Sequence, residues 1–337
     1  MTTTPTGSPE PAIRAEGLVK RFGDQRAVDG IDLDVRRGEV FGVLGPNGAG
    51  KTTMLRMLAT LLPIDAGRAS VFGLDVATEG HRVRALLGVT GQYASVDENL
   101  TAAENLMLFG RLLGLPRREA RARGEQLLAQ FDLTEAASKS IGQFSGGMRR
   151  RLDLAVSLIT HPPLIFLDEP TTGLDPRTRG QMWQTIRDLV GQGCTVLLTT
   201  QYLDEADQIA DRIAVIDRGV KVAEGTPEEL KGSVGRSTLQ LSLADPAQVA
   251  AAVALAARLV EERPTTPQGS QRIHVPLARS DQATDVLVSL RDHGIAVESL
   301  TVAKPSLDEV FLALTGHTAE AADEDPTSTD HDLEVAR

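Results

Sequence analysis

One eight-residue segment restricts the fold of this chain more than any other feature. Gly45-Pro46-Asn47-Gly48-Ala49-Gly50-Lys51-Thr52 follows the apolar run VFGVL and precedes TTMLRMLATLL, whose apolar residues recur at helical spacing. The segment matches G-x-x-x-x-G-K-[ST] in the strand–loop–helix setting of a phosphate-binding loop. Its glycines allow backbone N–H groups to surround phosphate oxygens, and the positive end of the helix dipole faces the same oxygens. We expect Lys51 to reach the outer phosphates and Thr52 to offer its hydroxyl to Mg²⁺.

Two adjacent carboxylates form the second half of the predicted site. Asp168 and Glu169 end the apolar run LIFLDE. Neighbouring strand residues point to opposite faces of a sheet, so we expect the two acids to have different roles. Asp168 would bind the Mg²⁺ shell, and Glu169 would align or deprotonate an attacking water. A solvated acid pair is the alternative for this dipeptide alone, but the phosphate loop and the following PTTGLDP favour catalysis.

A serine–glycine turn lies upstream of these acids. Ser145-Gly146-Gly147 leads into the helical run RRRLDLAVSLI. Ser145 is a favourable N-cap, and the two glycines permit close approach of the backbone to an anion. The turn is a weak signal alone and a strong one beside the phosphate loop and the acid pair.

The order of patterns along the chain predicts an α/β nucleotide-binding domain over residues 12–232. Short apolar runs that end in polar residues are typical of buried parallel strands with the chemistry at their C-terminal ends. Between residues 99 and 140 the strand signal is absent, so we expect an inserted helical subdomain at about residues 97–155. The predicted strands cover residues 40–45, 86–91, 164–169, 195–200 and 212–217.

The pattern changes after residue 232. Residues 233–317 alternate strand-like and helical runs and predict a small accessory α+β domain with no catalytic motif. A structural or dimerisation module is the simpler interpretation, and a ligand sensor is the alternative. We expect residues 1–11, rich in Thr, Pro and Ser, and the acidic residues 318–337 to be disordered.

Composition excludes several classes of protein. With 35 basic and 46 acidic side chains the formal charge is −11, which argues against a nucleic-acid-coating protein. No run approaches the ~20 apolar residues that cross a bilayer, and the first residues lack the pattern of a secretory signal. Any membrane spans must therefore come from another polypeptide. The single cysteine, Cys194, cannot form an internal disulfide, and we expect a small buried apolar side chain there.

Taken together, the motifs resemble the nucleotide-binding subunit of an ABC transporter. The resemblance rests on the phosphate loop, Gln92 in VTGQYAS, the signature FSGGM, LIFLDEP and Gly173-Leu174-Asp175, and it covers about residues 12–232. The segments TGQYASVDENLT, SGGMRRRLDLA, TTQYLDEAD and SLDEVFLALTGH resemble the daunorubicin-resistance exporter type and extend the match to about residue 317.

The resemblance implies an ATPase whose complete site needs two copies of the chain. In that family, one ATP lies between the phosphate loop of one subunit and the signature of another. Each motif occurs once here, so a homodimer is implied. The residues implied to bind nucleotide are Phe22, Gly45, Pro46, Asn47, Gly48, Ala49, Gly50, Lys51, Thr52, Thr53, Ser145, Gly146, Gly147 and Asp175, with Asp175 facing the opposite subunit. Those implied to hold Mg²⁺, partly through water, are Thr52, Gln92 and Asp168.

Two positions depart from the family pattern. Phe22 stands where a tyrosine usually stacks on adenine; its ring keeps a π face, and a place in the core is the alternative. Gln201 stands where a histidine usually contacts the γ-phosphate. A glutamine can donate to a phosphate oxygen but cannot become cationic near pH 7. Because the daunorubicin-type pattern contains this glutamine, we expect an active ATPase that uses Glu169, Gln201 and Gln92.

The resemblance also implies a partner in the membrane. It predicts a separate multi-span permease, peripheral attachment at the cytoplasmic face of the cell membrane, and export of a hydrophobic drug or metabolite. The alternative is a soluble ABC-type regulatory ATPase that is not coupled to transport. Ribosome-associated relatives carry two phosphate loops and DNA-repair relatives carry long coiled-coil arms, and this sequence shows neither. A simple kinase or GTPase would not explain the signature or LDEPTTGLDP.

Overall fold

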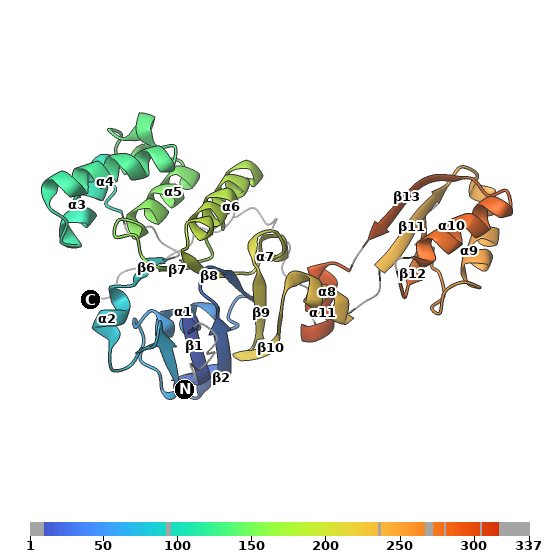
Figure 1. Cartoon of the computed structure of the whole chain (residues 1–337), viewed down its shortest axis with the longest axis horizontal. Helices are drawn as coiled ribbons and strands as arrows, with labels where there is room; N and C mark the ends of the chain where they lie inside the picture. The colour runs from blue at the N-terminus through green and yellow to red at the C-terminus, as the bar shows by residue number, and fades with distance from the viewer. Residues whose placement is uncertain are drawn as a thin grey trace, which may run out of the picture.

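A six-stranded sheet carries the predicted site. The computed structural model describes residues 10–91, 96–234, 237–266, 272–279, 281–303 and 305–316. Five strands of this sheet are parallel, and the sixth, β10, runs antiparallel to β9 at one edge (Figure 1). In spatial order the strands are β10 (Val220–Gly225), β9 (Arg212–Asp217), β3 (Val40–Leu44), β8 (Thr195–Thr200), β7 (Leu164–Asp168) and β6 (Leu87–Thr90).

The inner strands are apolar throughout because both of their faces are covered. In β7, Leu164 and Phe166 pack into one hydrophobic core, while Ile165 and Leu167 pack into another on the opposite face. Successive strand residues point to opposite faces, so a strand buried on both sides needs an unbroken apolar run. All five predicted strands of this part are confirmed to within two residues at each end.

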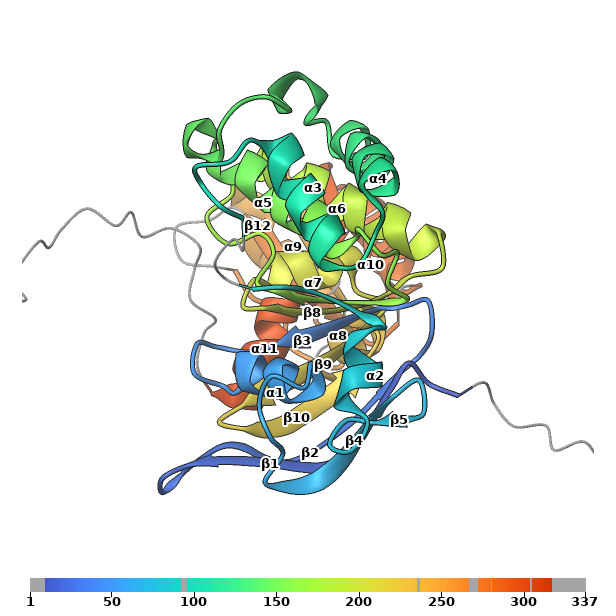
Figure 2. The same cartoon turned by 90° about the vertical axis from the view of Figure 1, so that its left-hand side faces the viewer.

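An antiparallel sheet covers the phosphate-loop side of the molecule. The helix α1 (Lys51–Leu58) lies between this sheet and the six-stranded one, and α2 (Gly80–Arg84) follows nearby (Figure 2). These strands were not predicted individually from the sequence. In spatial order they are β2 (Gln25–Val35), β1 (Ile13–Phe22), β4 (Ala66–Val71) and β5 (Leu74–Asp75).

A helical layer covers the other face of the six-stranded sheet (Figure 2). Between β6 and β7, the described residues form helices and one isolated bridge, Thr101–Ser140, but no strand. A capping box of Thr101 and Glu104 begins the first of these helices. The layer contains α3 (Ala102–Leu112), α4 (Arg117–Gln130), the short η1 (Thr134–Ala136) and η2 (Ile141–Gln143), α5 (Gly146–Ser157) and α6 (Pro176–Gly191).

The C-terminal part forms a three-stranded sheet with its own core. The strands have the order β12-β11-β13, and the helices α9 and α10 pack on the sheet. The elements are β11 (Ser237–Leu243), η3 (Pro246–Gln248), α9 (Val249–Ala256), β12 (Arg272–Leu277), α10 (Gln282–Asp292) and β13 (Val297–Ala303).

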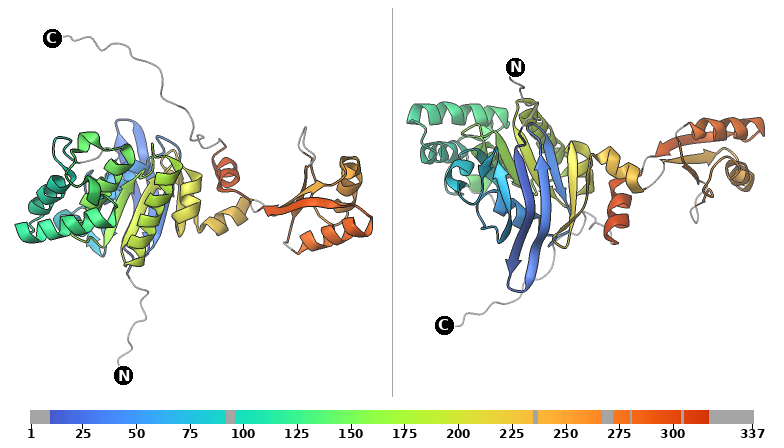
Figure 3. Two further views of the ribbon diagram at one scale, coloured as in Figure 1. Left: turned by 90° about the horizontal axis from the view of Figure 1, so that it is seen from above. Right: turned by 60° about the horizontal axis from the view of Figure 1, so that its bottom comes forward.

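The last helix, α11 (Leu307–Thr315), does not join that core. Its Leu307, Val310 and Phe311 are buried with Leu203 of α7 (Leu203–Ile209) and Leu230 of α8 (Pro227–Val234). Figure 3 shows α8 and α11 together at the neck between the two parts. The domain boundary at residues 232 and 233 stays a prediction, but the final helix of the predicted accessory domain packs against α7 and α8.

The described part of the chain begins at Glu10 and ends at Gly316. Of the two segments predicted to be disordered, only residues 10 and 11 lie among the described residues. There, Arg37 Nε donates to the Glu10 carbonyl at 2.8 Å. Within the described ranges, no helix combines the length and apolar character needed to cross a bilayer.

Candidate nucleotide-binding site

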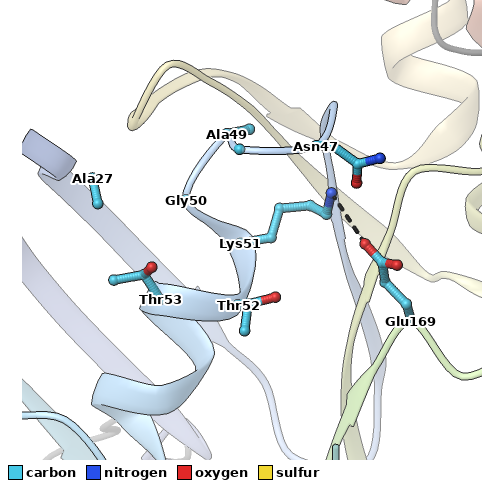
Figure 4. Close-up of a pocket in the computed structure, with 9 residues that line it drawn as sticks. Ala27, Asn47, Ala49, Gly50, Lys51, Thr52, Thr53 and Glu169 are labelled. Carbon is cyan, nitrogen blue, oxygen red and sulfur yellow. Dashed lines mark ion pairs between the residues drawn. The ribbon is translucent and has the colours of Figure 1, made fainter. Parts of the chain in front are cut away.

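The phosphate loop joins β3 to α1 and leaves the first turn of the helix open. Gly50 is the N-cap of α1. Because glycine has no side chain, it offers no side-chain acceptor to the first N–H groups of the helix. Its φ is 103°, and a Cβ there would lie 2.2 Å from the Ala27 carbonyl oxygen. Only glycine fits this position. The pocket in Figure 4 is lined by Ala27, Asn47, Gly48, Ala49, Gly50, Lys51, Thr52, Thr53 and Glu169.

Lys51 points back into the loop from the first turn of α1. Its side chain is 4% exposed, and Nζ donates to the carbonyls of Gly45 at 2.7 Å and Pro46 at 3.1 Å. Nζ also lies 3.5 Å from Glu169 Oε1 (Figure 4). Burial lowers the pKa of Lys51, and the Glu169 carboxylate opposes that shift. The loop thus holds a cation where phosphate oxygens would enter.

Asp168 is fixed between two hydroxyl groups. Its Oδ1 accepts from Thr52 Oγ1 at 3.0 Å and from Thr199 Oγ1 at 2.6 Å. Asp168 and Thr199 are register partners at the ends of β7 and β8. The described residues contain no group of three or more His, Cys, Asp or Glu that could hold a metal ion alone. A hydroxyl and a carboxylate are hard oxygen donors of the kind Mg²⁺ uses together with phosphates and water, so these residues fit Mg²⁺.

Glu169 adopts a backbone conformation that is unusual for its type. Its φ is 49°, in the left-handed region, and its N–H donates to the Thr199 carbonyl at 3.1 Å. Thr172 Oγ1 donates to Glu169 Oε2 at 3.3 Å. Non-glycine residues in this region are strained and cluster at functional sites. The turn directs the Glu169 carboxylate toward Lys51 (Figure 4).

The position of Gln201 follows from strand register. It comes directly after β8, whose last residue, Thr200, pairs with Leu44 at the end of β3. The Gly45 N–H donates to the Thr200 carbonyl at 3.3 Å. The ends of β3, β7 and β8 therefore bring the phosphate loop, the acid pair and the Gln201 backbone to one edge of the sheet.

The signature turn lies on the opposite face of the sheet from α1. Ser145 caps α5 and accepts from the Met148 N–H at 3.3 Å, as predicted. A Cβ on Gly147 would lie 2.5 Å from Cγ2 of Thr178 in α6, whereas one on Gly146 would meet no atom within 4 Å. None of the three signature residues lines the pocket of the phosphate loop.

The remaining predicted site residues lie at the surface or outside the described residues. Asp175 is exposed and caps α6, accepting from the Thr178 hydroxyl at 2.6 Å and from the N–H groups of Arg177 and Thr178. These bonds lower its pKa. Phe22 is 51% exposed, which excludes the core alternative, but it does not line the pocket. Gln92 lies outside the described residues.

Two charged residues whose side chains turn inward, Arg150 and Glu205, were not predicted from the sequence. Arg150 of α5 donates to backbone carbonyls at the ends of β6 and β7. Glu205 of α7 is fully buried and accepts from the Thr171 hydroxyl at 2.9 Å and the Trp183 indole N–H at 3.2 Å. Burial raises the pKa of Glu205. Arg150 lies inside the quoted signature run and Glu205 inside TTQYLDEAD, but neither run indicates that these side chains turn inward.

Sequence comparisons agree with this geometry. Residues 28–172 match the ABC transporter family, and residues 225–315 match the C-terminal domain of DrrA1-3-like ATP-binding proteins. The chain is 53% identical over 310 residues to the daunorubicin resistance ATP-binding protein DrrA2 of Streptomyces coeruleorubidus, covering 92% of this chain and 96% of that protein. The chain belongs to the ABC-transporter ATP-binding family.

Within the ABC-transporter ATP-binding family, similarity extends along nearly the whole chain. The daunorubicin/doxorubicin resistance ATP-binding protein DrrA of Streptomyces peucetius is 52% identical over 335 residues, covering 96% of this chain and 99% of that protein. Among solved structures, a dimeric post-hydrolysis ATP-binding cassette bound to ADP and Pi is similar, with a TM-score of 0.59 and 26% identity. It covers 64% of this chain and 98% of that chain. The predicted fold class and ABC-type ATPase activity are thus confirmed.

Proposed function

We propose that two copies of this chain close around MgATP and couple its hydrolysis to export through a separate membrane permease. The supporting observation is the separation of the two half-sites. The phosphate-loop pocket contains Lys51, Thr52 and Glu169, whereas the turn at Ser145 lies on the other face of the sheet. One chain therefore cannot complete a site by itself, whereas in a two-fold symmetric dimer the Ser145 turn of each copy can complete the phosphate-loop pocket of the other.

Within each site the residues divide the chemistry. The N–H groups of α1 and Lys51 bind the phosphates, and Asp168 and Thr52 hold Mg²⁺, which neutralises developing charge when bound. Glu169 takes the proton of the attacking water, since it is the remaining carboxylate at the pocket. Gln201 donates its amide hydrogen to a phosphate oxygen. Phe22, Gln92 and Asp175 keep the roles that the family resemblance implies.

The cargo and the location follow from the relatives. The two Streptomyces proteins are named for resistance to daunorubicin, a finding that supports a hydrophobic drug or metabolite as the exported molecule. Attachment would then be peripheral, at the cytoplasmic face of the cell membrane, through the permease. A regulatory ATPase that is not coupled to transport would instead hydrolyse ATP without changing drug efflux from cells.

The substitution Glu169→Gln tests the proposed dimer. It should slow hydrolysis by about 10²–10⁴-fold while ATP binding persists, because the amide cannot accept the proton of water. Size-exclusion chromatography with light scattering should then show an ATP-dependent dimer. Ser145→Arg added to both copies blocks both sites and should prevent the dimer without loss of ATP binding, whereas Lys51→Ala should weaken ATP binding itself. A Glu169→Gln chain that binds ATP yet stays monomeric, even beside its permease, would contradict the proposal.

A further inference from the structure

Three consecutive arginines of α5 point in three directions. Arg149 forms a partly exposed ion pair with Glu98 at 2.9 Å. Arg151 donates to the Phe131 carbonyl at 3.0 Å, within the helical layer. Arg150 turns inward toward the six-stranded sheet, and its side chain is 12% exposed. Only Arg150 of the three reaches the ends of the strands that carry the site.

The Arg150 guanidinium binds four backbone carbonyl groups. Nε donates to Pro170 at 3.0 Å, and Nη1 donates to Gly91 at 2.5 Å. Nη2 donates to Asp168 at 2.7 Å and to Glu169 at 3.0 Å. These carbonyls belong to the residue after β6, to the last residue of β7 and to the first two residues of the turn that follows β7. A planar fork with five N–H donors can satisfy such an array, whereas a lysine ammonium cannot match its geometry.

The bonds explain how Glu169 keeps its strained backbone. At a φ of 49° its carbonyl leaves the hydrogen-bonding pattern of the strand and accepts from the Thr172 N–H at 3.3 Å. Arg150 supplies a second donor to this carbonyl and also binds the carbonyls of the residues on either side, Asp168 and Pro170. The same guanidinium holds Gly91, the residue directly before Gln92. One side chain thus connects α5 to the backbone of both segments expected to act on the attacking water.

We propose that Arg150 is a positioning residue for ATP hydrolysis, holding the backbones of Glu169 and Gly91 of its own chain against α5. This inference rests on the proposed function, in which Glu169 accepts the proton of water. The first turn of α5 carries the signature that would engage the nucleotide of the partner copy. A displacement of α5 in one site is therefore transmitted to Glu169 in the other.

The first test compares Arg150→Met and Arg150→Lys with a matched control, Arg149→Met. Removing the donors at position 150 should lower kcat by about 10²-fold, because Glu169 loses its fixed direction. The Kd for ATP should change by less than about threefold, since the phosphate loop is untouched. The kcat of Arg150→Lys should lie between those of wild type and Arg150→Met, because lysine keeps the positive charge but not the planar set of guanidinium donors. Arg149→Met should hydrolyse ATP as wild type does.

A mixing experiment separates positioning of Glu169 from support of the signature turn. Mixed dimers of Lys51→Ala and Ser145→Arg chains contain one complete site, which takes Lys51 and Glu169 from the Ser145→Arg copy. Adding Arg150→Met to that copy should lower the recovered hydrolysis by about 10²-fold. Adding it to the Lys51→Ala copy, which supplies only the signature turn, should leave the hydrolysis within about twofold. Arg150→Lys serves the same design if Arg150→Met does not fold.

Several results would overturn this role. One is a folded Arg150→Met chain with the kcat of wild type. Another is a mixed dimer in which Arg150→Met lowers ATP hydrolysis only when it is on the copy that supplies the signature turn, since Arg150 would then support that turn. A wild-type chain that does not hydrolyse ATP overturns the proposed function, and the role of Arg150 with it.

Discussion

At the scale of single residues, Gln201 tests whether hydrolysis depends on a cationic side chain. It follows β8 at the edge where the phosphate loop begins, and it stands where the family resemblance implies a histidine. We expect Gln201→His to keep ATPase activity within about tenfold, because both side chains can donate to a phosphate oxygen. Steady-state ATPase assays between pH 6 and 8 would measure this. A near-complete loss would mean that the loop geometry depends on the amide.

Cys194 gives a prediction with a defined pH dependence. Burial raises its pKa to about 12, and its Sγ lies 3.4 Å from the Pro162 carbonyl oxygen. At pH 8 about 10⁻⁴ of this thiol is ionised, against about a quarter in an unfolded chain, so iodoacetamide should react about 10³-fold more slowly with folded protein. The folded rate should rise about tenfold per pH unit from 7 to 9. Equal labelling rates for folded and urea-unfolded chains would contradict this.

The sequence was sufficient for residues that belong to fixed motifs. Lys51, Thr52, Asp168 and Glu169 were predicted to act together, and the strand register brings them to one edge of the sheet. Arg150 could not be predicted in the same way, because its hydrogen-bond partners at the strand ends are backbone carbonyls. Such contacts depend on packing between α5 and the strand ends, which a helical pattern does not specify.

At the scale of elements, α5 and α6 touch through Gly147 and Thr178. The Thr178 hydroxyl is held by Asp175, so its methyl group cannot turn away without losing that bond. Gly147→Ala should destabilise the protein by about 1–3 kcal/mol through overpacking. Thr178→Ser, which removes the methyl group and keeps the hydroxyl, should restore most of this loss. Gly146→Ala, in open space, is the matched control.

Thermal unfolding of the three variants and the double variant would measure the effect. The structural explanation would be wrong if Gly146→Ala and Gly147→Ala destabilised the protein equally. It would also be wrong if Thr178→Ser did not restore the stability of Gly147→Ala.

Strands buried on both faces were predictable, and the antiparallel sheet was not. The former are unbroken apolar runs between polar ends. In β1 and β2, register shifts between Ala15 and Leu18 and again toward Arg21 interrupt the alternation that would identify a strand. The pairing of β1 with β4 also joins segments that are far apart in sequence. Neither feature produces a local pattern.

At the scale of the whole molecule, α11 anchors the end of the described chain to α7 and α8. Deleting residues 233–317 should expose the apolar surface that Leu307, Val310 and Phe311 cover. The free energy of unfolding should therefore fall by about 3–6 kcal/mol. Replacing residues 237–303 alone with a short Gly/Ser linker keeps that helix and should cost much less. Melting temperatures of the two shortened proteins would measure the difference. Equal melting temperatures would show that α11 contributes little to stability.

The helices α8 and α11 share one hydrophobic core, although the three-stranded unit separates them in sequence. That unit is therefore inserted into the ATPase domain between α8 and α11. The chain enters and leaves this unit at neighbouring points, because Thr238 at the start of β11 pairs with Ala303 at the end of β13. The three-stranded unit can therefore unfold locally without disrupting any strand of the six-stranded sheet. A different folded domain whose termini lie close together could replace this unit, and α11 would still pack on α7 and α8.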